Sequence, residues 1–371
     1  MLKKIILLIV LLFPWPVLAH DGAVDNHEEI LSAKIIEITA EKEIIKEDGS
    51  KIIQQNLKLR GLKGQWKNRT FNFEGISDLE VIGNNRYKKG DKVLVNYIQN
   101  DEGRETFLVF DYVRTGSLYL LAAIFAIVTL LVGRKKGLKA LISLILSFLI
   151  ILYFIVPQIL SGGNALTISL VGGFLILVIM IYLTEGFNKK SHLAIISIFI
   201  SLLITFLLSW LFTYLARLSG LAQEEAIYLT GITKTPLNFQ GLLLAGILIG
   251  TLGVLDDIIL SQIEAVEQLK IANHDLTRRE IFRSAFSIGN THLGAAINTL
   301  FLTYAGAALP LLLLFSIKQP PFMSFSQVIN SEMIAAEIVR TLTGSIGIAL
   351  ALPIATIIAT YSIKPGKGVK I

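Results

Sequence analysis

The sequence lacks cysteine altogether, and charged residues make up only 17% of its 371 residues. Without cysteine the chain forms no disulfide and no thiolate metal site, and it carries no lipid on an N-terminal cysteine. It also lacks a G-x-x-x-x-G-K-[ST] phosphate loop, an H-E-x-x-H zinc motif and a G-x-S-x-G nucleophile turn. These absences argue against a single-chain ATP-driven pump, and we expect no cofactor and no metal.

Long apolar stretches, by contrast, are abundant. Hydrophobic residues make up 53% of the chain and the mean hydropathy is +0.65, so the sequence predicts a multi-pass membrane protein whose first partner is the lipid bilayer. The net charge of +6 does not indicate nucleic-acid binding, because the basic residues gather in short loops between apolar stretches. Seven stretches are predicted to cross the bilayer: 118–132, 138–156, 165–184, 192–215, 239–260, 291–315 and 334–361.

The N-terminus is typical of a secreted chain. Residues 1–19 begin with two lysines, continue through a short apolar run and end in Val17-Leu18-Ala19, which predicts a signal peptide. An uncleaved anchor is the alternative, but two prolines and the short apolar run argue against a stable span. Residues 20–29 are predicted to form an acidic linker, which we interpret as solvated rather than metal-binding.

Residues 30–113 have the pattern of a small all-β domain. Short runs of β-branched and aromatic residues alternate with glycine, asparagine and aspartate turns. We expect a small barrel of the OB or SH3-like kind, which either docks a partner or serves as a stable external cap. The expected strands are Leu31–Ile38, Ile52–Leu59, Arg69–Phe73, Lys92–Tyr97 and Thr106–Tyr112.

The loop charges predict an orientation for the α-helical membrane bundle, residues 114–363, and for the basic tail, residues 364–371. One set of loops together with the tail holds thirteen basic residues, whereas the opposite loops hold only Arg217, Lys234 and Lys318. By the positive-inside rule the first set is cytoplasmic, which places the β domain outside and the C-terminus inside. The thirteen are Arg134, Lys135, Lys136, Lys139, Lys189, Lys190, Lys270, Arg278, Arg279, Arg283, Lys364, Lys367 and Lys370.

The predicted helix 239–260 carries a regular stripe of small and acidic residues. Glycines allow another backbone to approach closely, and a carboxylate facing lipid would be costly. We therefore expect a buried polar seam between this helix and the next one, with Thr291, Gly294 and Asn298 on the far side. The stripe recurs at steps of four and three through Gly246, Gly250, Gly253 and Asp257.

The adjacent carboxylates of Asp256 and Asp257 point about 100° apart on a helix. Asp257 continues the glycine stripe, so we expect it in the seam and Asp256 at the wet membrane boundary. Residues 275–288 are expected to form a short amphipathic helix on the inner membrane surface, capped by Asp275.

Three motifs resemble the YibE/F family of bacterial multi-pass membrane proteins. They are GxxGxxDD at 250–257, EGFNKK at 185–190 and GxxxNTLFxxYAGxxxP at 294–310. Asn290-Thr291 stands where members of the family usually carry an acidic residue. The resemblance implies a helical bundle in a bacterial plasma membrane and leaves the activity open.

Three functions are compatible with these patterns. A secondary transporter or permease would use Asp257, with Asn298, Asp256, Glu185 and Thr291 along the path of an unknown ion or small molecule. A scaffold or sensor would present the β domain outside the membrane. Its partner would be a second copy of the chain, in a homo-oligomer, or another membrane protein. An intramembrane hydrolase ranks last, because adjacent carboxylates on one helix are poorly placed to share a water.

Overall fold

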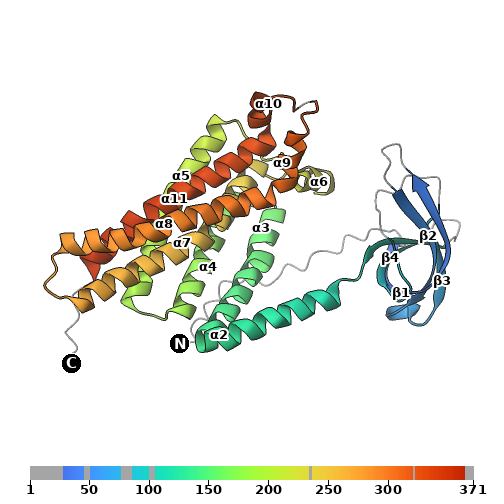
Figure 1. Ribbon diagram of the computed structural model, residues 1–371, viewed down its shortest axis with the longest axis horizontal. Coiled ribbons are helices and arrows are strands. Elements are labelled where there is room, and N and C mark those ends of the chain that lie inside the picture. The colour runs from blue at the N-terminus through green and yellow to red at the C-terminus, as the bar shows by residue number, and fades with distance from the viewer. Residues whose placement is uncertain are drawn as a thin grey trace. The chain divides into compact units, whose positions relative to one another are not determined.

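The computed structural model describes residues 28–45, 51–76, 86–99, 105–233, 236–320 and 322–363. The predicted signal peptide, nearly all of the acidic linker and the basic tail lie outside these ranges. The chain forms two compact units, a smaller one that ends at Val128 and a larger one that begins at Thr129 (Figure 1). Each unit is described by itself.

The smaller unit is built on a strongly curved antiparallel sheet (Figure 1). Alternating side chains point inward, and Ala33, Ile35 and Leu59 are fully buried in its core. The rings of Phe71 and Phe107, on the two edge strands, stack at 4.2 Å, so the sheet closes into a half-barrel, which confirms the expected small all-β fold. The strand order is β3-β2-β1-β4-β5, with β1 Glu28–Ile45, β2 Lys51–Gly61, β3 Thr70–Glu74, β4 Lys92–Gln99 and β5 Glu105–Tyr112, and a single 3-10 turn follows β2 at Gly64–Trp66.

Helix α2, Thr115–Ile150, follows β5 after only two residues. Its backbone leaves helical geometry at Arg134, where φ is 47° and ψ is −125°, so α2 consists of two helices. The second helix continues through a π-helical turn, Ile151–Ile155, into α3, Val156–Leu160. Pro157 follows the π-helical turn directly, and because proline has no amide hydrogen it cannot donate to the preceding turn.

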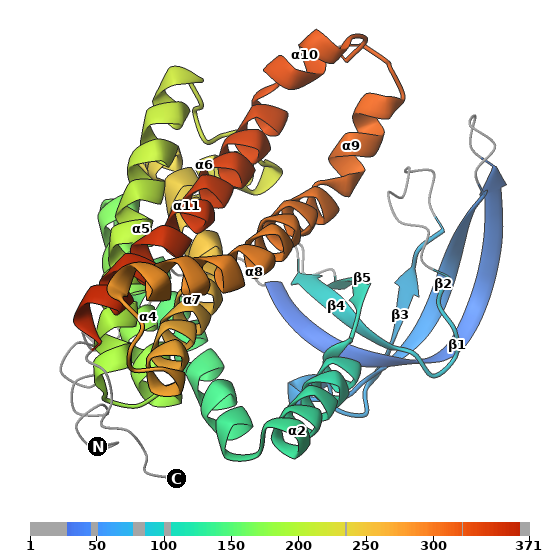
Figure 2. The ribbon, with the colours of Figure 1, turned by 60° about the vertical axis from the view of Figure 1, so that its left-hand side comes forward.

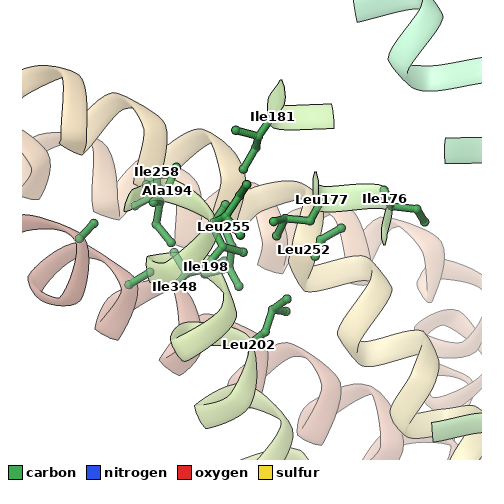
Figure 3. Close-up of a cluster of buried hydrophobic side chains, with 14 of the residues drawn as sticks. Ile176, Leu177, Ile181, Ala194, Ile198, Leu202, Leu252, Leu255, Ile258 and Ile348 are labelled. Carbon is green, nitrogen blue, oxygen red and sulfur yellow. The ribbon is translucent and has the colours of Figure 1, made fainter. Parts of the chain in front are cut away.

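The larger unit is a helical bundle with α7 at its centre (Figures 1 and 2). Helix α7 contacts α4, α5, α8 and α11, and isoleucine and leucine side chains from α4, α5, α7 and α11 form the core (Figure 3). The long helices are α4 Ala165–Thr184, α5 Lys189–Leu215, α7 Phe239–Ala272, α8 Arg278–Ala307 and α11 Glu332–Ser362; the short ones are α6 Glu224–Ile232, α9 Leu309–Ser316 and α10 Phe325–Asn330.

The described residues include five helical stretches long and apolar enough to cross a membrane, or six if the bent pair α8 and α9 forms one span. The first of the five, Thr115–Leu160, contains the break at Arg134. Dividing it there gives six, or seven when the bent pair is counted as one span, which is compatible with the predicted count of about seven. The chain is thus an integral membrane protein.

Two predicted helix boundaries differ from the structure. Residues 275–288 do not form a separate surface helix, because α8 runs unbroken from Arg278, and its N-cap is Thr277, whose capping box with Glu280 satisfies the first amides better than Asp275. The predicted span 291–315 is broken at Ala308 with a bend of 64°, since Pro310 cannot continue the hydrogen-bond ladder.

The packing of α5 against α11 depends on small residues. Hydroxyl side chains at Ser197, Ser201 and Thr205 are buried at steps of four and donate to carbonyls of their own helix. Gly347 of α11 lies directly against the Thr205 side chain, and the Ser209 hydroxyl donates to Thr343 Oγ1 at 2.8 Å. Close backbone approach, of the kind that the sequence suggested for another pair of helices, therefore occurs here.

Candidate functional site

The predicted glycine stripe of α7 is exposed within the chain. A Cβ atom added at Gly246 or Gly253 would meet open space, and at Gly250 it would meet only the Tyr304 hydroxyl. On α8 the predicted partners Thr291, Gly294 and Asn298 are exposed as well. The expected buried seam between these two faces is therefore wrong for the single chain.

The burial of α7 explains why the seam fails. Its four neighbours cover the faces that carry Ile247, Leu255 and Ile259, each of which is fully buried. Lipid is as apolar as these side chains, so helix packing in a bilayer rests on van der Waals contacts, which a large aliphatic side chain makes in number and a glycine does not. The glycine stripe is thus the face that packing leaves uncovered.

The two adjacent aspartates have exchanged their expected places. Asp257 is exposed on the glycine stripe, whereas Asp256 is half-buried. Asp256 Oδ1 is enclosed and has no hydrogen-bond partner among the residues that the structure describes. The carboxylates of Asp257 and Glu185 are close enough to interact with the charge of Asp256. Asp256 is therefore the enclosed carboxylate, and Asp257 and Glu185 lie nearer to the surface.

The turn between α4 and α5 positions Glu185, which is the C-cap residue of α4. Gly186 allows the reversal because its φ is 84°, in the left-handed region. The Asn188 side chain caps α5 by accepting from Ser191 N at 2.9 Å, and its amide donates to Glu185 O at 2.9 Å. These bonds hold the EGFN segment in one conformation.

An ion-pair cluster joins α5 to α7 about two to three turns beyond the aspartates. Lys190 contacts Glu264 at 2.6 Å and also pairs with Glu267. Because α7 has 34 residues, it is about 51 Å long and exceeds a ~30 Å hydrocarbon core. If the first part of α7 crosses the bilayer, the cluster falls at its polar boundary, where charged pairs are ordinary.

A second polar cluster, on the other half of the bundle, was not recognised as one site from the sequence. Arg340 pairs with Glu337 at 3.2 Å, as their spacing on one helix predicts, and its guanidinium also lies 5.6 Å from the Tyr304 ring centroid. The Tyr304 hydroxyl in turn contacts the position of Gly250. The signal in the sequence was an arginine within the apolar run 334–361, but nothing there identified Tyr304 as its neighbour.

Gln262 is a third polar residue that the sequence did not single out. Its side chain is buried, and its amide donates to Ala285 O at 2.9 Å and to Thr356 Oγ1 at 2.7 Å. These two bonds connect α7 to α8 and to α11. Because the amide nitrogen donates to acceptors on two other helices, we interpret Gln262 as a structural link between them.

Comparison with known proteins identifies a family for the helical bundle. The family described as YibE/F-like protein matches residues 121–365, which covers both polar clusters and the aspartate pair. No curated protein and no solved structure matches the chain. Since the match spans about two thirds of the 371 residues and the bundle has the expected apolar helices, this chain belongs to the YibE/F-like protein family.

Proposed function

We propose that this membrane protein is a secondary transporter or permease in which Asp256 binds and releases a proton or cation. One observation carries the proposal: Asp256 Oδ1 is enclosed in the bundle without a hydrogen-bond partner among the described residues. A carboxylate inside a membrane protein is costly, and such residues commonly line ion pathways. An oxygen that no described group satisfies is available to a transported ion or to a proton.

The surrounding groups suit this role. Asp257 and Glu185 supply negative charge beside Asp256, and Asp257 is open to the surroundings of the chain, so cations are attracted toward the enclosed oxygen. Asn298 and Thr291 lie on the exposed face of α8, and we assign them to contact with the solute rather than to binding of the ion. The identity of the solute is left to experiment.

The first prediction follows from the different burial of the two aspartates. Asp256→Asn should reduce ion-coupled uptake at least tenfold, because the amide keeps the shape of the carboxylate but cannot ionise. Asp257→Asn is the matched control on the adjacent position and should retain most of the activity. Purified variants in proteoliposomes, tested with labelled cations and metabolites under an imposed pH gradient, provide the measurement.

The outcomes separate the alternatives. Equal activity of wild type and Asp256→Asn would remove Asp256 from the mechanism, and a stronger loss in Asp257→Asn would return the function to the exposed stripe. If no tested solute moves, the scaffold or sensor role gains support, because the β domain carries a cavity that such a role requires. The intramembrane hydrolase remains the weakest alternative, because adjacent carboxylates on one helix are poorly placed to share a water.

A further inference from the structure

The β domain contains a surface cavity whose charged lining residues are all basic. It has a volume of about 580 Å³, within the range of small-ligand sites. Arg60, Lys34 and Lys89 contribute the cations, and none of the acidic residues that the structure describes lines the cavity. Within the part of the chain that the structure describes, none of these three forms an ion pair or a side-chain hydrogen bond. Their charges are therefore available to a ligand.

The strand register brings like charges together. Lys34 on β1 lies directly opposite Arg60 on β2 and directly opposite Lys92 on β4. Ala33 and Ile35 on either side of Lys34 are buried in the core, so Lys34 points to the outer face of the sheet. Like charges in directly opposed positions destabilise a sheet, which indicates that this arrangement serves something other than stability.

The remaining polar groups of the cavity also favour an anion. The Asn68 side chain lines it and makes no hydrogen bond to the described residues, so its amide is free to donate. The carboxylate of Asp91, one residue before β4, accepts from the Lys88 amide at 2.8 Å and is not among the residues that line the cavity. Arginine with neighbouring lysines and an amide is a donor set that matches a phosphate oxyanion.

We propose that this cavity, lined by Lys34, Arg60, Asn68 and Lys89, binds a phosphate group. The ligand is either a free phosphate or the headgroup of an anionic phospholipid. Chain continuity favours the lipid: Val113 N donates to Lys92 O at 2.8 Å, on the rung that holds Lys34, and α2 begins two residues later at Thr115. Two strand spacings of about 5 Å each therefore separate Lys34 from the segment that enters the apolar helix.

The test uses the purified full chain in an uncharged detergent. Isothermal titration calorimetry with inorganic phosphate, and separately with dihexanoyl phosphatidylglycerol, should show saturable binding of at least one of them. The double change Lys34→Gln and Arg60→Gln should weaken that binding at least tenfold, because two charge-assisted hydrogen bonds are lost. The variant should fold, because it removes repulsion and breaks no ion pair of the described residues.

Lys42→Gln is the matched control, since Lys42 is exposed on the same strand β1 but lies away from the cavity. Binding of phosphate identifies a free oxyanion as the ligand, whereas binding of the phospholipid alone identifies the headgroup; both support the proposal. No binding of either probe, or an equal loss in Lys42→Gln, would overturn it.

Discussion

Lys270 shows how a single buried charge holds one end of the bundle. Its side chain is only 4% exposed, and Nζ donates to Thr360 O and Ile363 O at 2.6 Å each. Lys189 donates to Ser362 O nearby. The last carbonyls of α11 have no partners within their own helix and carry partial negative charge, so these two lysines supply what the helix end lacks.

The second prediction concerns this cap. Lys270→Met should lower the melting temperature of the protein in detergent by roughly 3–6 °C, since losing hydrogen bonds from a charged donor costs about 1.5–3 kcal/mol. Lys135→Met, at an exposed position of α2, should change it by less than about 1 °C. Equal melting temperatures for both variants would show that water caps α11 equally well.

The sequence predicted which face of α7 each aspartate occupies but not which of the two faces is buried. The step of three and four placed Asp257 with the glycines correctly, and the structure keeps them on one face. The expectation failed because it assumed that small residues attract a neighbour. In this bundle α7 has four neighbours, and the large aliphatic side chains decide which faces they cover. Which helices would be those neighbours is a long-range property that local spacing does not contain.

At the scale of whole helices, α5 and α11 pack closely against each other. The hydroxyl stripe of α5 and Gly347 of α11 allow an approach that larger residues would prevent. The sequence shows these small residues, yet the two helices are separated by more than a hundred residues, so their pairing was not predicted.

The third prediction compares two glycines. Gly347→Leu should destabilise the protein by about 1–3 kcal/mol and lower its yield, because a side chain there would collide with Thr205. Gly253→Leu should be tolerated, since its Cβ meets open space. Thermal unfolding of both variants in detergent gives the comparison. A destabilised Gly253→Leu variant would point to a partner, such as a second copy of the chain, on the exposed stripe.

The strands were more predictable than the helix contacts. Each expected strand matches an observed one within a few residues, apart from the longer β1, because alternation and turn residues are local signals. The break at Arg134 falls in the predicted loop between the stretches 118–132 and 138–156, whereas the short helices α6 and α10 were not expected.

For the whole molecule, the orientation in the membrane is a prediction from the loop charges. With thirteen basic residues on one side and three on the other, we expect the β domain outside the cell and the C-terminus in the cytoplasm. A reporter that is active only in the cytoplasm should work when fused after Ile371. A reporter that is active only outside should work when inserted at 46–50, between β1 and β2. The opposite pattern would reverse the topology.

The two residues between β5 and α2 also limit how far the basic cavity can move from the start of α2. If α2 enters the membrane near its first residues, this short connection would present the cavity with lipid at an effective concentration in the millimolar range. Even a weak site would then stay occupied by lipids of the adjoining leaflet, whereas a dilute solute would have to bind far more tightly to compete. Local concentration, rather than intrinsic affinity, would select the occupant of the basic cavity.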